Sequence, residues 1–221
     1  MIPAYNEAGN IAEVIRRLLK EAPEADILVV DDGSADDTAK ICKDMGVRVA
    51  RHAVNLGLAE AVRTGMKYAV SHGYDHCMQF DADGQHDETA VGAMLKTAKE
   101  QGAGIVIGSR LLEGKLDSAL KSFGSRLISD CIKLCSGVRI KDPTSGMRLY
   151  DRRVMKKYVS STHYSPEPDM LAFFAKRGVK IVEIPVRMRE RMSGSSYLDI
   201  TESLRYMFRM CTSILILQWF R

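Results

Sequence analysis

The sequence lacks the features that mark secreted, zinc-binding and membrane-spanning proteins. Its five cysteines are an odd number without a C-x-x-C pair, so no disulfide framework or zinc site is indicated, and we expect a reducing compartment. There is no N-x-S/T sequon, and no signal peptide is recognisable after Met1. The longest strongly apolar run, 214–217, extends loosely to 210–220, which is short of the ~20 residues that a spanning helix needs. These absences together predict a cytoplasmic protein.

The chain also lacks a large net charge. Its 32 basic and 28 acidic side chains leave +4, which gives no case for a nucleic-acid partner. The excess is uneven, because the stretch from residue 187 to the end has six arginines and three acidic residues and so carries +3 of it. A basic and apolar end of this kind fits the inner face of an anionic membrane or a phosphate-bearing ligand. A solvated helix face and a homodimer contact are the alternatives.

Several familiar catalytic motifs are missing. No G-x-G-x-x-G follows a predicted strand, and neither G-x-S-x-G nor H-E-x-x-H occurs. Residues 108–115 resemble a P-loop, but the final Gly-Lys comes one residue too late and Leu116 replaces the required Ser or Thr. Of the five histidines, only His86 lies close to a cluster of acidic residues.

Strand and helix signals alternate along the first half of the chain. The run 27–30 has no polar residue, which is typical of a parallel strand buried on both faces. Ser34 is a candidate cap for a helix that ends before Gly46. This βαβαβ rhythm predicts an α/β fold with a doubly wound sheet, whose ligands bind outside the carboxyl ends of the strands. The predicted strands are 2–3, 27–30, 47–50, 76–80 and 104–108, and the helices are 11–19, 34–45, 57–71 and 88–100.

The second half departs from this rhythm. Helices are predicted at 120–135 and 166–176, strands at 147–150 and 180–188, and one or two helices at 199–220. Without a repeat or a linker, we expect one domain over 1–198, followed by an amphipathic helical segment at 199–221. Within this domain, 1–110 is the predicted nucleotide-sugar-binding half and 111–198 the acceptor half.

Carboxylates follow three of the predicted strands. Glu7 comes after the first, Asp31 and Asp32 after the second, and Asp81 and Asp83 after the strand at 76–80. Five carboxylates at neighbouring strand ends repel one another unless a divalent cation or hydrogen-bond donors from a ligand offset the charge. Positions i and i+2 of an extended chain point the same way, so the last pair can reach one hard cation. An isolated Asp-x-Asp is more often a turn or a helix cap, so the inference depends on the whole arrangement.

The ordered motifs resemble glycosyltransferase family 2. In the first half these motifs are I-P-A-Y-N-E at 2–7, V-V-D-D-G-S-x-D-x-T at 29–38, N-x-G at 55–57 and D-A-D-G-Q-H at 81–86. The second half resembles the dolichol-phosphate mannose synthase branch through G-S-R at 108–110, S-R at 125–126, D-P-T-S-G-M-R-L-Y at 142–150, E-I-P-V at 183–186 and R-M-x-G-x-S at 191–196. The resemblance implies the GT-A fold, a mostly parallel central sheet flanked by helices, here with C-terminal helices.

The resemblance also implies roles for individual residues. It places a UDP-sugar or GDP-sugar donor against Pro3, Tyr5, Glu7, Asp32, Asp81, Ala82 and Arg110. It assigns Mg²⁺ or Mn²⁺ to Asp81, Asp83 and Gln85, and the acceptor or its phosphate to Arg126 and Ser196. The catalytic residues that it implies are Asp83, Asp169 and Arg191. Asn55 and Gly57 are as well explained by a strand-to-helix turn as by a ligand contact, and Arg148 is expected to pair with Asp142 or Asp151.

Two acceptors are compatible with these residues. The resemblance implies transfer of a sugar, with inversion, to a polyprenyl phosphate or another membrane-linked acceptor. A phosphate acceptor is already ionised near pH 7 and needs no general base. Tyr197 replaces the phosphate-holding lysine of the branch, which favours a hydroxyl of a growing cell-surface polysaccharide. A hydroxyl acceptor needs a base, and Asp169 occupies the nearest position, although a first-turn carboxylate that interacts with the helix dipole explains it too. A sugar nucleotidyltransferase is disfavoured because 3–9 has no basic residue, and an inactive scaffold because Asp32, Asp81, Asp83 and Arg191 are present.

Overall fold

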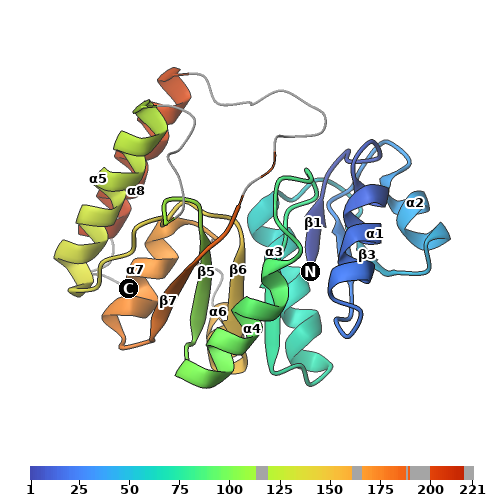
Figure 1. Ribbon diagram of the computed structural model, residues 1–221. Coiled ribbons are helices and arrows are strands. Elements are labelled where there is room, and N and C mark those ends of the chain that lie inside the picture. The colour runs from blue at the N-terminus through green and yellow to red at the C-terminus, as the bar shows by residue number, and fades with distance from the viewer. Residues whose placement is uncertain (113–118, 161–165, 188, 190–199, 217–221) are drawn as a thin grey trace.

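The computed structural model describes residues 1–112, 119–160, 166–187, 189 and 200–216 (Figure 1). Seven strands occur in this part of the chain: β1 (Ile2–Ala4), β2 (Leu28–Asp31), β3 (Arg48–Arg51), β4 (His76–Gln79), β5 (Ile105–Ser109), β6 (Arg148–Asp151) and β7 (Ile181–Pro185). The helices are α1 (Ile11–Glu21), α2 (Thr38–Asp44), α3 (Leu58–Ser71), α4 (Ala90–Gln101), α5 (Ala119–Ser136), α6 (Arg152–Val159), α7 (Pro168–Lys176) and α8 (Ile200–Leu215).

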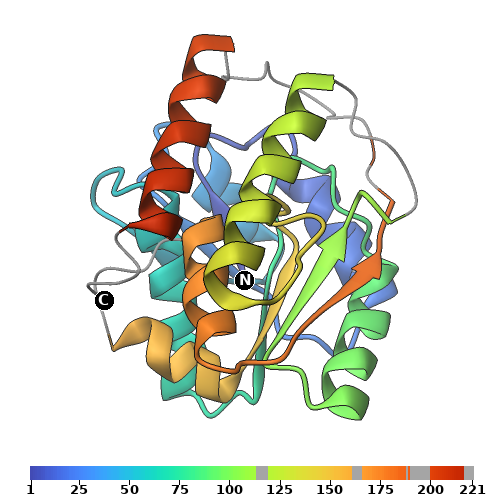
Figure 2. The same cartoon turned by 90° about the vertical axis from the view of Figure 1, so that its left-hand side faces the viewer.

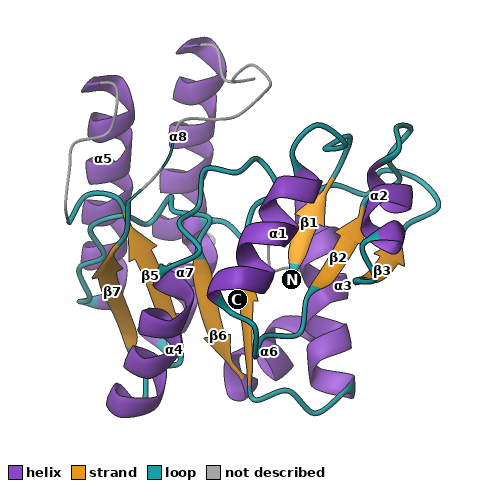
Figure 3. Ribbon diagram, turned by 45° about the vertical axis from the view of Figure 1, so that its right-hand side comes forward, coloured by secondary structure: helices purple, strands orange, loops and turns teal. Residues whose placement is uncertain are grey.

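The strands form a mostly parallel sheet in two groups, β3-β2-β1 and β4-β6-β5-β7. Met1 joins the groups, because its amino group donates to the carbonyl of Met78 (2.8 Å) and its carbonyl accepts from the amide of Phe80 (3.1 Å). Only β6 runs antiparallel to its neighbours among the described strands. The carboxyl ends of β2, β1 and β4 therefore meet side by side at one edge, as the sequence predicted. Figure 3 shows β1 beside β2.

Helices cover both faces of the sheet. Successive side chains of β5 point to opposite faces of the sheet, since Ile105 and Ile107 face one core and Val106 faces the other. The first core lies under α3, α5, α6, α7 and α8, and the second lies under α1, α2 and α4. Figure 2 shows α5 and α8 side by side, and Met210 and Ile214 of α8 belong to the first core. The arrangement is the predicted α/β fold with C-terminal helices.

Two local predictions were wrong. Helix α2 begins at Thr38, and Ser34 does not cap it, because the Ser34 hydroxyl accepts a hydrogen bond from the amide of Asn6. Helix α6 was not predicted at all. It begins directly after β6, where the Asp151 carboxylate accepts from the amide of Val154 (2.7 Å) and caps the helix. A strand that turns into a helix without an intervening loop leaves no glycine or proline as a boundary signal.

None of the helices in the described ranges has the length and hydropathy to cross a membrane.

Candidate active site

The loops after β1 and β2 are bound to each other. The amide of Asn6 donates to the hydroxyl of Ser34, and the amide of Ala35 donates to the side-chain oxygen of Asn6, both at 2.9 Å. Asn6 has a φ of 55°, a left-handed conformation that asparagine tolerates better than most residues. The amide of Glu7 donates to the hydroxyl of Thr38 (2.9 Å). These contacts make one unit of two of the three predicted loops, so Asn6, Ser34 and Thr38, which lie in the predicted motifs but had no role assigned to them, position the site.

The residues expected at the nucleoside from the first loop differ in accessibility. Pro3 is buried in β1, whereas Tyr5 is 47% exposed at the end of the strand. The Glu7 carboxylate is half-buried and accepts a hydrogen bond from the side-chain amide of Asn10 (2.7 Å). Tyr5 is thus the member of this loop with an open aromatic face for a ligand.

The two aspartates at the end of β2, Asp31 and Asp32, are buried and have hydrogen-bond or ion-pair partners within the protein. Asp31 forms an ion pair with Arg51 on the neighbouring strand (2.9 Å) and accepts from the amide of Ser34 (3.1 Å). Asp32 accepts from the amides of Leu56 (2.9 Å) and Gly57 (2.7 Å) and contacts a histidine, described below. Cationic and amide donors of the protein thus offset part of the charge of this pair, and the expected contact of Asp32 with the nucleoside stays a prediction.

His86 holds the loop after β4. Its Nδ1 accepts from the amide of Asp81 (3.0 Å), and its Nε2 lies 3.3 Å from the Asp81 carboxylate. The ring is buried and meets Phe80 edge-on, with 5.1 Å between the centroids. Asp83 accepts from the amide of Gln85 (3.1 Å), which closes a tight turn. Ala82 between the two aspartates is buried, while Asp81, Asp83 and Gln85 are partly exposed.

The segment 142–148 reaches the same edge from the antiparallel strand. A side chain at Gly146 would displace the Asp81 carboxylate, because its Cβ would lie 2.5 Å from one of the carboxylate oxygens. The hydroxyl of Ser145 donates to the carbonyl of Gly108 (2.6 Å), which fixes this segment to the end of β5. Gly146 is therefore a site residue that we did not predict, and only its place in the 142–150 motif signalled it.

Arg110 and Asp142 join the ends of two segments. The guanidinium donates through Nε (2.7 Å) and Nη2 (2.6 Å) to the two carboxylate oxygens, and Nη2 also donates to the Thr144 hydroxyl (2.8 Å). Asp142 is fully buried, and Arg110 remains about one quarter exposed. The expected contact of Arg110 with donor phosphate stays a prediction, and the ion pair is what the structure shows.

Arg148 is buried under the start of α7, and its predicted pairing with Asp142 or Asp151 was wrong. Its guanidinium donates to three backbone carbonyls, those of Ser145 (2.8 Å), Pro143 (2.8 Å) and Pro166 (3.2 Å). Asp142 is bound to Arg110 instead, and Asp151 lies at the far end of the strand, where it caps α6. A buried cation beside the carboxyl edge of the sheet is electrostatically favourable for an anionic ligand.

Two carboxylates lie at the start of α7, close to α8. The Asp169 carboxylate is 6% exposed and accepts from the hydroxyl of Ser213 (2.9 Å). Glu167 forms an ion pair with Arg209 (2.6 Å), and burial nevertheless raises the pKa of Glu167 above its ordinary value. Burial also raises the pKa of Tyr206 to about 12. Helix α8 thus supplies the partners of both acidic residues, which sequence spacing gave no means of predicting.

The remaining predicted residues are dispersed. Arg126 is exposed on α5, on the side of the molecule formed by α5 and α8. Arg191, Ser196 and Tyr197 lie outside the described residues. Arg189, just before them, donates through its amide to the carbonyl of Gln85 (2.9 Å) and pairs with Glu88 (2.7 Å). Arg189 therefore lies beside the loop that carries Asp83 and Gln85.

The oxygen donors after β4 suit a hard divalent cation. Asp81, Asp83 and Gln85 supply carboxylate and amide oxygens on one exposed turn, the ligand type that Mg²⁺ and Mn²⁺ prefer. Among the residues whose side chains are described, no three His, Cys, Asp or Glu side chains gather into a complete metal site. The donor set fits a cation that takes its other ligands from water and a diphosphate.

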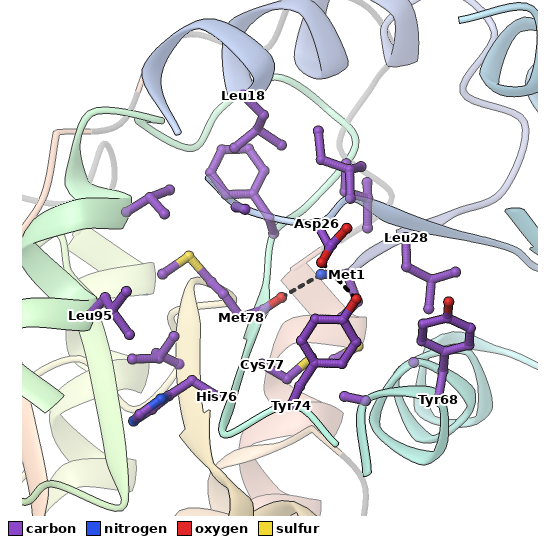
Figure 4. Close-up of a pocket in the computed structure, with 18 of the residues that line it drawn as sticks. Met1, Leu18, Asp26, Leu28, Tyr68, Tyr74, His76, Cys77, Met78 and Leu95 are labelled. Atoms are coloured by element: carbon purple, nitrogen blue, oxygen red, sulfur yellow. Dashed lines mark hydrogen bonds between the residues drawn. The ribbon is translucent and has the colours of Figure 1, made fainter. Parts of the chain in front are cut away.

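An apolar cavity of ≈ 360 Å³ lies at the opposite edge of the sheet (Figure 4). Its lining includes the start of β1, β2 and β4, with Leu28 and Cys77 among the residues drawn. The Tyr74 hydroxyl donates to Asp26 (2.7 Å) at its rim. Because this cavity lies at the amino ends of the strands, it is separate from the loops described above.

Residues 1–159 match the family model for glycosyl transferase family 2. The chain belongs to this family. Among its relatives, the polyprenol monophosphomannose synthase of Mycolicibacterium smegmatis is 29% identical over 95% of this chain and 84% of its own length. The undecaprenyl-phosphate mannosyltransferase of Micrococcus luteus is 30% identical over 90% of this chain and 86% of its own. These relatives match the dolichol-phosphate mannose synthase-like branch, and the protein is a glycosyltransferase.

The glycosyltransferase also resembles a solved structure in its fold. The glucosyl-3-phosphoglycerate synthase of Mycobacterium tuberculosis superposes with a TM-score of 0.71 at 19% identity, over 98% of this chain and 78% of the other. This likeness confirms the GT-A fold.

Proposed function

We propose that the enzyme transfers a sugar from a UDP-sugar or GDP-sugar to a polyprenyl phosphate, with inversion at the anomeric carbon. The observation that carries the proposal is the convergence of Asp32, the Asp81–Asp83 turn and the start of α7 at one edge of the sheet. The acceptor is proposed because the two relatives described above are named for polyprenol phosphate and undecaprenyl phosphate.

A divalent cation is part of this proposal. Asp81, Asp83 and Gln85 would hold Mg²⁺ or Mn²⁺, and a structural neighbour at 19% identity was solved with Mn²⁺ and UDP. When bound, the cation stabilises negative charge on the leaving diphosphate. His86 and Gly146 keep the Asp81 carboxylate in place, the first through the contact of its Nε2 with that carboxylate (3.3 Å) and the second by leaving room for it.

The residues of the chain orient the two phosphates. In a single displacement, an acceptor phosphate oxygen bonds to the anomeric carbon while the bond from that carbon to the diphosphate breaks, and the nucleoside diphosphate leaves. The acceptor is ionised near pH 7, so no proton has to be removed. Arg126 and Arg191, with Ser196, are the proposed partners of the acceptor phosphate, and buried Arg148 adds positive potential beneath the edge.

A saccharide hydroxyl is the second candidate acceptor, and the geometry of Asp169 favours it. The carboxylate lies in the first turn of α7, is nearly buried and is held by Ser213 (2.9 Å). A carboxylate oriented in this way suits a general base, which a hydroxyl acceptor requires. A first-turn carboxylate also interacts favourably with the helix dipole, so variants are needed to separate the two roles.

Exposed apolar side chains on α5 and α8 support a membrane-bound acceptor. Phe123 and Leu134 of α5 are 62% and 80% exposed, and Phe208 of α8 is 77% exposed. Arginines lie among them, including Arg126 and Arg209. Aromatic and basic side chains together favour an anionic membrane surface, so we propose peripheral attachment at the cytoplasmic face. Homodimer formation through the same helices is the competing explanation.

The direct test is a transfer assay with labelled UDP-sugars and GDP-sugars, offered either a polyprenyl phosphate in vesicles or an oligosaccharide. We expect product only with the lipid phosphate, and only with Mg²⁺ or Mn²⁺ present. Product from the oligosaccharide alone would support the second candidate. Formation of a nucleotide sugar from a nucleoside triphosphate and a sugar phosphate would replace the proposal with a nucleotidyltransferase, and binding without any turnover would indicate an inactive scaffold.

A further inference from the structure

Asp32 lies at the centre of a chain of hydrogen bonds. His52 Nδ1 is 2.7 Å from Asp32 Oδ1, and His52 Nε2 is 2.9 Å from the hydroxyl of Thr64 on α3. A carboxylate only accepts, so Nδ1 must carry the proton, and in the neutral ring Nε2 then accepts from the Thr64 hydroxyl. The aspartate thereby selects the tautomer in which His52 donates from Nδ1, and the Thr64 hydroxyl satisfies and positions the other ring nitrogen.

The two oxygens of Asp32 are not equivalent. Oδ1 accepts from His52 and from the amide of Leu56 (2.9 Å), whereas, within the described part of the chain, Oδ2 accepts only from the amide of Gly57 (2.7 Å). A carboxylate has about four lone-pair sites, two on each oxygen. Both sites of Oδ1 are therefore occupied, and Oδ2 has room for a single further donor.

The 54–57 loop, whose amides donate to Asp32, packs closely on the turn after β2. A Cβ at Gly33 would lie 2.6 Å from the backbone carbon of Val54, and Gly33 itself has a φ of 74°. A residue other than glycine is strained here and also displaces the 54–57 loop. The carboxylate consequently cannot turn to offer both oxygens to a ligand without breaking its contacts with Leu56 and Gly57.

We infer that the donor nucleotide is a uridine diphosphate rather than a guanosine diphosphate, and that His52 and Thr64 set this preference. The inference rests on the proposed function, in which Asp32 contacts the base. Uracil presents one ring N–H, which matches the single site on Oδ2. Guanine presents two adjacent donors, its ring N–H and its amino group, which a carboxylate satisfies best by using both oxygens. One guanine donor would be left unpaired at a desolvated site, and this loss disfavours GDP.

The test compares the Kd of UDP with the Kd of GDP by titration calorimetry in the presence of Mn²⁺. For the unmodified enzyme we expect UDP to bind at least about tenfold more tightly, as an unpaired buried donor implies. His52→Leu removes the donor to Oδ1. In this variant the Kd of GDP should lie within about threefold of the Kd of UDP, because Asp32 gains a free acceptor position. His52→Asn is the matched control, since its side-chain amide donates from the position of Nδ1, and it should keep the preference.

Thr64→Val and Thr64→Ser form a second pair, which tests whether the hydrogen bond with Thr64 positions the His52 ring and leaves the aspartate and the histidine unaltered. In the valine variant the ratio of the Kd of GDP to the Kd of UDP should move toward one, and in the serine variant this ratio should stay as in the unmodified enzyme. A merely structural role of His52 would weaken UDP and GDP equally and leave the ratio unchanged, which would overturn the inference, as would equal affinities in the unmodified enzyme. If neither nucleotide binds, the proposed function itself fails.

Discussion

Arg110 meets Asp142 with two parallel hydrogen bonds, Nε to Oδ2 at 2.7 Å and Nη2 to Oδ1 at 2.6 Å. The amide of Arg110 also donates to Oδ2 (3.0 Å), and the amide of Asp142 donates to Glu183 on β7 (2.8 Å). The pair thus joins the end of β5 to the segment that leads into β6. It is a contact between residues 32 positions apart, and its partners come from two separate motifs of the sequence.

Replacing Arg110 by alanine should destabilise the protein, because Asp142 is fully buried and would lose its cationic partner. Breaking a buried pair costs about 3–5 kcal/mol, and we expect about 2–4 kcal/mol here because Arg110 is partly exposed. Urea unfolding measures the change. Arg110→Lys keeps the charge and loses the two parallel hydrogen bonds, so its free energy of unfolding should lie between those of the unmodified protein and the alanine variant. Unchanged stability with a raised donor KM would instead assign Arg110 to the donor phosphate.

Replacing Asp83 by alanine should abolish turnover and leave the cooperative melt intact, because its side chain lies on a partly exposed turn. In thermal-shift measurements, UDP should stabilise the unmodified protein clearly more with Mn²⁺ than without it. A ligand at a hundredfold excess over its Kd adds about 2.7 kcal/mol. The variant should show no such difference between the two conditions. Equal shifts of the unmodified protein with and without metal would refute the metal site.

Asp169→Asn distinguishes the two acceptors. If the acceptor is a hydroxyl, the change should lower kcat on the order of 10²–10⁴-fold, because the base is lost. If the acceptor is a polyprenyl phosphate, kcat should change little, and Arg126→Ala should be the damaging substitution through lost pairing with the phosphate. Both variants are assayed against both acceptors. Ser213→Ala is a useful companion, since it removes the hydrogen bond to Asp169 and keeps the carboxylate.

Stability should depend on pH through Glu167. Burial raises the pKa of this carboxyl above its ordinary value near 4.5, although Arg209 opposes the shift. The folded state therefore binds this proton more tightly than the unfolded state, and the associated stability is present below about pH 4.5 and is lost as pH rises through the folded pKa. Relative to the unmodified protein, Glu167→Gln should become more stable as pH increases from 4 to about 7.

Glu13 provides the control for this measurement. A hydrogen bond from Arg17 lowers the pKa of the exposed Glu13 carboxyl, so its contribution is present above its unfolded pKa and is lost as pH falls. The variant Glu13→Gln should accordingly lose stability relative to the unmodified protein as pH rises. Parallel curves for the two variants would contradict the assigned shifts.

Much of the fold was predictable because the signals are local. Apolar spacing located α1, α3, α4 and α5 to within a few residues, and the run without polar residues at 27–30 located β2. The helix α6 was missed because Asp151 serves both as the last residue of β6 and as the cap of the helix. Ser34 was misassigned because its hydroxyl has a tertiary partner, Asn6, whose position depends on the pairing of β1 with β2.

The sequence by itself determined that the carboxylates at the ends of β2 and β4 lie at the carboxyl edge of the sheet. The residues that follow each strand can be identified from the local sequence. Parallel strands bring their carboxyl ends together, so Asp32, Asp81 and Asp83 were assigned to one site in advance. Only the tertiary structure decided the partner of each charge. Whether Asp32 meets His52, and whether Arg148 meets a carboxylate or three carbonyls, depends on the antiparallel direction of β6 and the packing of α3 and α7. From the sequence alone, any acidic residue is an equally suitable partner for a given basic residue. The burial of each charge and the distance between the two charges select the partner in the folded protein.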